Sequence, residues 1–152
     1  MIDAFQLLLR VRYSECDAQG IVFNARWAEY VDVAAGEFSR ALFGAIDPTQ
    51  TGTDWKLVKQ TLEWKASGRY DDVLDVRVRC VRVGTTSFTL ATEFRRHGDD
   101  SVLVTAETVY VLSIPRSVRS GACPIISGSR SSAARRASAS IKQAFSVSCS
   151  HA

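Results

Sequence analysis

The sequence contains few of the residues from which metal sites are built, with only 4 cysteines and 2 histidines among 152 residues. None of the cysteines belongs to a C-x-x-C pair; they are Cys16, Cys80, Cys123 and Cys149. Because structural zinc sites need closely spaced cysteine or histidine ligands, no metal site is predicted. Thiols spaced in this way are typical of reduced cysteines in the cytoplasm.

Long apolar runs are also missing. No stretch approaches the roughly 20 consecutive apolar residues that span a bilayer, and the first five residues, MIDAF, lack the basic region and apolar stretch of a secretory signal. We therefore expect a soluble cytoplasmic protein with no membrane partner. Apolar residues make up 46% of the chain, which is enough for the core of one domain.

Acidic residues are absent after Glu107, whereas six basic residues follow it, so the net charge of +3 becomes −3 without those six. Residues 116–152 are rich in Ser, Ala and Arg and show no sustained periodicity. This composition predicts a poorly ordered tail after one domain at residues 1–115. A basic tail can bind nucleic acid, but its sole aromatic residue is Phe145 and it has no folded motif, so no nucleic-acid partner is expected.

The periodicity of residues 1–112 predicts one helix and five strands. Apolar residues alternate from 4 to 13, as in a half-buried strand, and recur at spacings of three and four from 24 to 43, as in an amphipathic helix. Asn24 is the expected N-cap of this helix, and Gly44 is expected to end it. Four further segments have strand character: 55–64, 74–83, 86–96 and 102–112.

Gly84 and the segment 97–100 separate the last three strand segments and are expected to form hairpin turns. The order of strand, long helix and four strands therefore predicts a largely antiparallel meander that wraps around the helix. Such a sheet covers the apolar face of the helix, which gives an α+β fold.

The segment Glu15–Asn24, with the sequence ECDAQGIVFN, is where chemistry is expected. Asp17 lies three residues before Gly20, and the predicted helix begins directly afterwards. A carboxylate would thus lie beside unpaired backbone N–H groups, which can bind the oxygen of a polarised carbonyl. Asp17 could equally be an aspartate that only stabilises the turn, and these patterns alone favour neither role.

The pattern DxxGIVxNAxWxxY, from Asp17 to Tyr30, resembles the hotdog-fold family of 4-hydroxybenzoyl-CoA thioesterases and acyl-CoA thioesterases. The resemblance continues through Val58–Trp64 and the turn Arg69–Asp72 to Leu112, about three quarters of the chain. It implies a hotdog fold, in which a long central helix is wrapped by a curved, mostly antiparallel, five-stranded sheet. It favours a catalytic role for Asp17.

The resemblance implies hydrolysis of an acyl-CoA thioester to a carboxylate and CoA. Asp17 would attack the thioester carbonyl or activate a water molecule, the backbone N–H near Asn24 would polarise that carbonyl, and Gly20 would form the tight turn. CoA is part of the substrate, and no separate cofactor is implied. Some relatives carry histidine at the positions of Ile21 or Asn24; this chain does not, which argues against a histidine base and against a dehydratase.

The resemblance also indicates where a substrate would bind. Phe23, Trp27 and Tyr30 are candidates for an acyl pocket, although aromatic residues at helical spacing are more often core. The candidate cations for the CoA phosphates are Lys59, Arg95 and Arg96, with Lys65 and Arg69 as further candidates. Glu37 is an alternative catalytic carboxylate on the helix, and Cys16 is assigned to packing because Asp17 disfavours its thiolate.

Relatives of this fold pair their edge strands, which implies a homodimer that dimerises again into a tetramer. A protein that binds acyl-CoA or acyl carriers without catalysis is the main alternative on the same fold. The identity of the acyl group is left open by the sequence.

Overall fold

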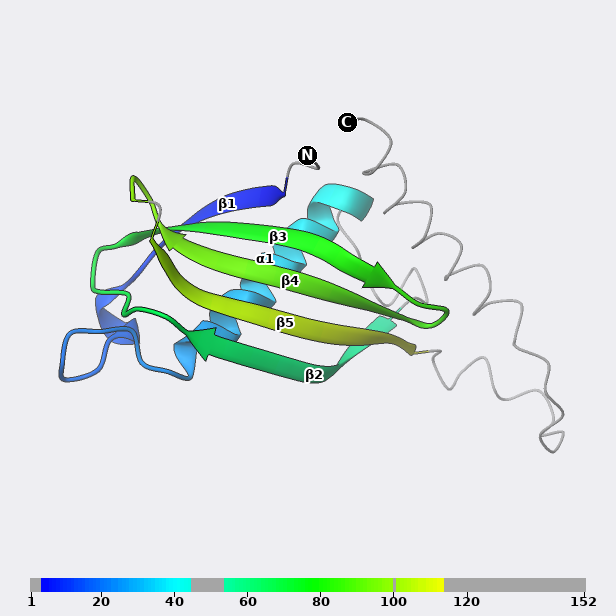
Figure 1. The fold of residues 1–152 in the computed structure, drawn as a ribbon, viewed down its shortest axis with the longest axis horizontal. Helices are drawn as coiled ribbons and strands as arrows, with labels where there is room; N and C mark the ends of the chain where they lie inside the picture. Colours follow the sequence, from blue (N-terminus) through cyan, green and yellow to red (C-terminus); the bar gives the residue numbers. More distant parts are fainter. Residues whose placement is uncertain (1–3, 45–53, 100, 114–152) are drawn as a thin grey trace, which may run out of the picture.

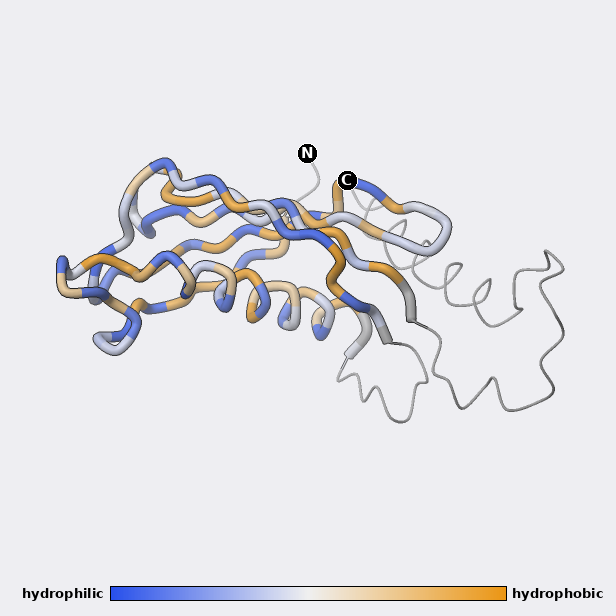
Figure 2. Tube along the Cα trace, turned by 90° about the horizontal axis from the view of Figure 1, so that it is seen from below, coloured by the Kyte–Doolittle hydropathy of each residue, from blue (hydrophilic) through white to orange (hydrophobic). Residues whose placement is uncertain are grey.

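The computed structural model describes residues 4–44, 54–99 and 101–113. One helix, α1, lies against one face of a curved sheet, as Figures 1 and 2 show from two directions. In chain order the elements are β1 (Phe5–Arg10), the 3₁₀ turn η1 (Tyr13–Glu15), α1 (Arg26–Phe43), β2 (Asp54–Trp64), β3 (Val73–Val83), β4 (Ser87–Arg96) and β5 (Val102–Ser113). The tail predicted at residues 116–152 lies outside the described residues.

The sheet has the strand order β1-β3-β4-β5-β2, and every neighbouring pair is antiparallel. The prediction of an antiparallel sheet is confirmed, but the meander includes only β3, β4 and β5. β2 pairs with β5 at the far edge instead of with β3. A long connection, residues 65–72, crosses the end of the sheet between β2 and β3, so these two strands do not form the hairpin that a meander requires.

The four later strands begin and end within one residue of the predicted positions. The first strand is shorter than predicted and ends at Arg10. Beyond it, the N–H of Val11 donates to the carbonyl of Asp72, and the N–H of Arg12 donates to Glu15 Oε2 at 2.6 Å. The first of these bonds continues the register of β1 with β3 by one residue, and the second turns the chain into η1.

Asn24 is not the N-cap of α1, so that prediction is wrong. Ala25 occupies the cap position with helical angles and makes no side-chain capping hydrogen bond. The N–H of Arg26 donates to the carbonyl of Phe23 at 2.8 Å, so a tight turn leads into the helix and leaves Asn24 outside it. At the other end Gly44 terminates α1 with φ of 76°, as predicted, and its N–H donates to the carbonyl of Arg40.

The core lies between α1 and the concave face of the sheet. The helix contributes buried side chains at helical spacing, and alternate residues of β3, β4 and β5 pack against them. Trp27 is 1% exposed and makes edge-to-face contacts with Phe94 and Tyr30 at centroid distances of 5.3 and 5.7 Å. Burial of these apolar groups stabilises the fold by about 25 cal/mol per Å². In the described ranges, no helix combines the length and hydropathy needed to span a membrane.

Candidate active site

Asp17 forms a tight turn with Gly20. The N–H of Asp17 donates to the carbonyl of Ile21 at 2.9 Å, and the N–H of Gly20 donates to the carbonyl of Asp17 at 3.0 Å. Gly20 has a φ of 73°, a left-handed conformation that glycine adopts without strain. The Asp17 carboxylate folds over this turn: its Oδ1 accepts from the N–H of Gln19 at 2.8 Å and from that of Ile21 at 3.4 Å.

The half-buried Asp17 carboxylate therefore has one oxygen committed to its own turn. Oδ2 accepts no hydrogen bond from the described residues and remains available for a ligand or water. The turn-stabilising role that the sequence left open is thus real, and it leaves one oxygen for chemistry.

Residues 21–23 are fixed on both sides by backbone pairing. Val22 donates its N–H to the carbonyl of Gly68 at 2.9 Å, and Phe23 donates to the carbonyl of Glu15 at 3.0 Å. Single antiparallel bridges also join Ile21 to Arg69 and Cys16 to Val22. The segment that leads from Asp17 to α1 is therefore held between the η1 region and the connection from β2 to β3, which lie at the same end of the sheet (Figure 1).

A pocket of about 400 Å³ lies at the start of α1. One wall is formed by Ile21, Val22, Asn24 and Trp27, and the other by Trp64, Lys65, Ala66 and Ser67. Asn24 is exposed, and its backbone N–H makes no hydrogen bond within the described part of the chain. An unpaired N–H at the positive end of a helix is suited to bind a carbonyl oxygen.

Lys65 brings a cation to this pocket, and its Nζ donates to Glu63 Oε2 at 2.6 Å. The hydrogen bond and the charge of Lys65 hold the pKa of Glu63 below its usual value. Asp17 does not line the pocket itself; it lies at the other end of the turn that ends at Ile21. The pocket thus combines an apolar wall, an unpaired backbone N–H and a cation, and the turn that begins at Asp17 ends at Ile21 in its wall.

Comparison with known proteins decides the family, because the model of the thioesterase superfamily matches residues 19–111. This chain belongs to the thioesterase superfamily. Membership supports thioester hydrolysis as the general activity. The matched residues begin two positions after Asp17, so the match itself does not test that carboxylate.

Two relatives illustrate the similarity. A putative esterase of Aquifex aeolicus (strain VF5) is 29% identical over 117 residues, which cover 72% of this chain and 90% of that protein. The structure of a gentisyl-coenzyme A thioesterase is 24% identical, with a TM-score of 0.70 over 93% of this chain and 99% of that one.

A third relative belongs to the family that the sequence resembles. The 4-hydroxybenzoyl CoA thioesterase from Pseudomonas sp. strain CBS-3 is 20% identical, with a TM-score of 0.65 over 72% of this chain and 84% of that one. The predicted family and the predicted α+β hotdog fold are confirmed.

The three aromatic residues predicted for an acyl pocket of this thioesterase-superfamily protein lie in different environments. Trp27 is buried, yet it lines the pocket. Tyr30 is 3% exposed and belongs to the core, where its hydroxyl donates to Glu15 Oε2 at 2.8 Å. Phe23 is 54% exposed on the surface. The structure therefore brings only Trp27 to the pocket wall.

The structure does not bring the predicted CoA-binding cations together. Lys59 is an exposed residue of β2, whereas Arg95 and Arg96 are consecutive residues of β4. β5 separates the two strands. Arg95 pairs with Glu93 on its own strand, and Arg96 pairs with Asp72 beside the connection between β2 and β3.

Cys16 and Glu37 both have partners that suit structural roles. Cys16 is half-buried, and burial, together with the charges of Asp17, Glu15 and Asp72, raises the pKa of its thiol, in agreement with a packing role. Glu37 forms an ion pair of 2.6 Å with Arg40 on α1. No cluster suited to hold a metal ion occurs among the described residues.

Proposed function

We propose that the protein is a cytoplasmic acyl-CoA thioesterase that releases a carboxylate and CoA. The observation that carries the proposal is that one short segment, Asp17–Asn24, holds both a carboxylate oxygen and a backbone N–H without partners among the described residues. The free oxygen of Asp17 lies at one end of a tight turn, and the free N–H of Asn24 lies just beyond the other end, beside a pocket. Superfamily membership supports the reaction class, and this geometry supports the assignment of residues.

In the proposed mechanism the thioester carbonyl oxygen accepts a hydrogen bond from the Asn24 N–H. Negative charge develops on that oxygen as the carbonyl carbon is attacked, and one preorganised donor of this kind is worth roughly 2.7–4 kcal/mol. Gly20, with its φ of 73°, allows the tight turn that begins at Asp17.

Two routes fit one carboxylate. In the covalent route Asp17 Oδ2 bonds to the carbonyl carbon, the C–S bond breaks to release the CoA thiolate, and water then hydrolyses the mixed anhydride. In the other route Asp17 takes a proton from a water molecule that attacks the carbonyl carbon directly, and the C–S bond breaks to release the carboxylate and the CoA thiolate. Accumulation of acyl-enzyme in rapid-quench experiments would distinguish the first route from the second.

The CoA phosphates require cations. Lys65 is the cation that lines the pocket, and we add it to Lys59 and Arg95 as a proposed contact for CoA. Lys65 and Arg95 are also paired, with Glu63 and Glu93, but Arg96 is less suited to this role because its guanidinium bonds both to Asp72 and to the carbonyl of Ser67. No metal or separate cofactor enters the proposed mechanism.

The proposal includes a homodimer that associates further into a tetramer. β2 is an edge strand with exposed apolar residues, Leu57, Val58 and Trp64, at 47%, 56% and 50% exposure. Exposed edges and apolar groups of this kind favour pairing with a second copy. Size-exclusion chromatography with light scattering tests this assembly, and a monomer at micromolar concentration would contradict it.

Asp17→Asn tests the catalytic assignment. With a panel of aromatic, short-chain and long-chain acyl-CoAs, the variant should fold normally and lose more than about 100-fold in kcat. Asp32→Asn is the matched control, because Asp32 is an exposed aspartate on α1 that does not line the pocket. Retention of most activity by Asp17→Asn would overturn the role of Asp17.

Binding without catalysis is the second candidate, and the two turn hydrogen bonds to Asp17 Oδ1 favour it because they suit a purely structural aspartate. Binding of a non-hydrolysable thioester analogue, with no hydrolysis of any member of the panel by the wild-type protein, would establish this alternative.

A further inference from the structure

We infer that Arg96 is a positioning residue for the proposed active site, acting through the connection between β2 and β3. The inference rests on the proposed function for its catalytic consequence, but its structural part can be tested separately. Arg96 does not line the pocket at the start of α1, so its effect must pass through other residues.

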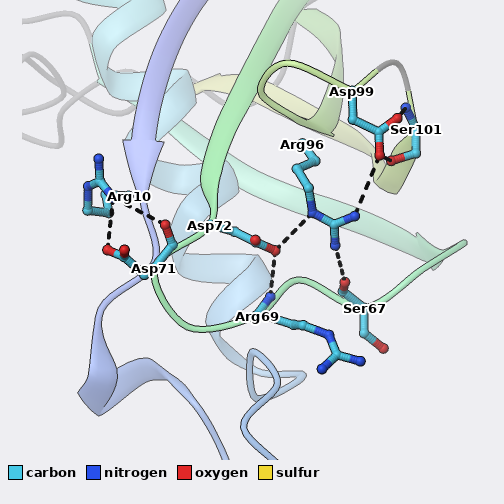
Figure 3. A network of polar contacts seen from close by, with 8 residues as sticks. All are labelled: Arg10, Ser67, Arg69, Asp71, Asp72, Arg96, Asp99 and Ser101. Carbon is cyan, nitrogen blue, oxygen red and sulfur yellow. Dashed lines mark hydrogen bonds and ion pairs between the residues drawn. The ribbon is translucent and has the colours of Figure 1, made fainter.

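One guanidinium group holds two points of the connection (Figure 3). Arg96 Nε donates to Asp72 Oδ2 at 3.2 Å, and Arg96 Nη2 donates to the carbonyl of Ser67 at 3.1 Å. Asp72 Oδ2 also accepts from the N–H of Arg69 at 2.8 Å. The Arg96 and Asp72 side chains are 33% and 19% exposed, so water screens this ion pair less than a fully exposed one.

The rest of the connection is anchored at its ends. The N–H groups of Lys65 and Ala66 donate to the carbonyl of Leu103, and Asp71 and Asp72 exchange backbone hydrogen bonds with Val11. Between these anchors, residues 67–69 are tied to the sheet by Arg96. The fork of its guanidinium, which lies between Ser67 and Asp72, sets the curvature of this short segment.

Residues 67–69 are in direct contact with the site. Gly68 accepts the hydrogen bond of Val22, and Arg69 is bridged to Ile21. The two segments are also closely packed, because a Cβ atom added to Gly68 would lie 3.1 Å from Trp27 Cζ2 and 3.2 Å from Val22 Cγ2. A shift of Gly68 must therefore move Val22, and Asn24, with its unpaired N–H, follows two residues later.

Loss of Arg96 should consequently misplace the Asn24 amide relative to Asp17 without removing either group. Because misplacement by about 1 Å can cost on the order of 100-fold in rate, Arg96→Met should lower kcat by roughly 10- to 100-fold. KM should change less than kcat, since every side chain that lines the pocket is kept even where Ser67 shifts. Arg96→Lys should recover part of kcat, because its ammonium can pair with Asp72 but cannot reproduce the planar fork.

The experiment measures kcat, KM, the free energy of unfolding and amide hydrogen exchange in wild type, Arg96→Met and Arg96→Lys. The matched control is Arg40→Met, which removes an ion pair with Glu37 on the exposed side of α1. We expect exchange at the Val22 and Arg69 amides to accelerate by more than about tenfold in Arg96→Met, with exchange at Leu90 in the core strand β4 unchanged. Arg40→Met should change none of these quantities.

Unchanged kcat and unchanged exchange at Val22 in a folded Arg96→Met protein would overturn the inference. Equal acceleration at Val22 and Leu90 would also overturn it, since this indicates general destabilisation. If Arg96→Met does not fold, the same comparison is decided on Arg96→Lys. A wild-type protein that hydrolyses no thioester would refute the proposed function, whereas the exchange measurements would still decide whether Arg96 fixes the Val22 segment.

Discussion

The hydroxyl group of Tyr30 donates a hydrogen bond of 2.8 Å to Glu15 Oε2 and thereby joins α1 to the turn that precedes Asp17. Glu15 Oε2 also accepts from the N–H of Arg12 at 2.6 Å. Burial, together with the hydrogen bond and charge of Glu15, raises the pKa of Tyr30. The hydroxyl therefore remains protonated at neutral pH and serves as a permanent donor that ties the core to the candidate site.

Tyr30→Phe should remove this donor while keeping the ring in the core. We expect a loss of about 1–2 kcal/mol in the free energy of unfolding, because a hydrogen bond to a charged acceptor disappears from a mostly buried place. Urea denaturation measures the change. Tyr13→Phe is the control, since Tyr13 is 82% exposed and should change stability by less than about 0.5 kcal/mol. Equal effects of the two substitutions would contradict the role of the Tyr30–Glu15 hydrogen bond.

Gly68→Ala should destabilise the protein, because the new methyl group would lie 3.1–3.2 Å from atoms of Trp27 and Val22. Trp27 is buried and cannot move aside freely, so we expect a cost of about 1–3 kcal/mol. Thermal and urea denaturation both measure it. Gly36→Ala is a matched control in α1, where a methyl group meets nothing within 4 Å. It should stabilise by up to about 1 kcal/mol through helix propensity, and a gain in stability for Gly68→Ala would disprove the close packing.

The sequence predicts local structure well because hydrophobic periodicity is a local signal. The span of α1 follows from apolar residues at helical spacing, and Gly44 ends it as expected. The predicted N-cap, Asn24, is one position too early. The turn from Phe23 to Arg26 depends on a backbone hydrogen bond, which has no signal in the side chains. The position of β2 beside β5 also has no local signature, because it depends on pairing across the whole sheet.

The candidate site is predictable only in part for the same reason. Asp17 and Gly20 form their turn within four residues, and the sequence shows it. The sequence does not indicate the pocket wall opposite Asn24, apart from Lys65. The connection from β2 to β3 is held there by hydrogen bonds from the N–H groups of Lys65 and Ala66 to the carbonyl of Leu103, which is far away in the sequence. The ion pair of Arg96 with Asp72 has no local signal either, because the two residues are 24 positions apart and only the fold brings them together.

Asp75 should make stability depend on pH. Burial by itself raises the pKa of this carboxyl group, but hydrogen bonds from Arg77 and Gln6, with the charge of Arg77, outweigh burial and hold the pKa below its usual value. Since the folded pKa is depressed, the ionised group stabilises the fold above the ordinary carboxyl pKa of about 3.9. This stabilisation is lost as the pH falls below that value and through the folded pKa.

Asp75→Asn removes the charge and isolates this effect. The variant should be less stable than wild type at pH 7, and the difference should shrink as the pH falls below about 4. Urea denaturation at a series of pH values measures both proteins under the same conditions. A stability difference that stays constant from neutral to acidic pH would show that the charge of Asp75 is not responsible.

The Cys16 thiol should be a poor nucleophile at neutral pH, although it is next to Asp17 in the sequence. Burial raises the pKa of its thiol, and the charges of Asp17, Glu15 and Asp72 raise it further, so the thiol is protonated at neutral pH. Its Sγ also lies 3.8 Å from the carbonyl oxygen of Arg12, to which it donates. Because the thiolate is the reactive form, alkylation of Cys16 by iodoacetamide at pH 7 should be slower than that of a cysteine peptide, as followed by mass spectrometry.

Cys16→Ser should retain kcat within about threefold, since the hydroxyl can keep the hydrogen bond to Arg12. Rapid alkylation at pH 7 together with loss of activity in Cys16→Ser would reverse this assignment and make the thiol, instead of Asp17, the candidate nucleophile.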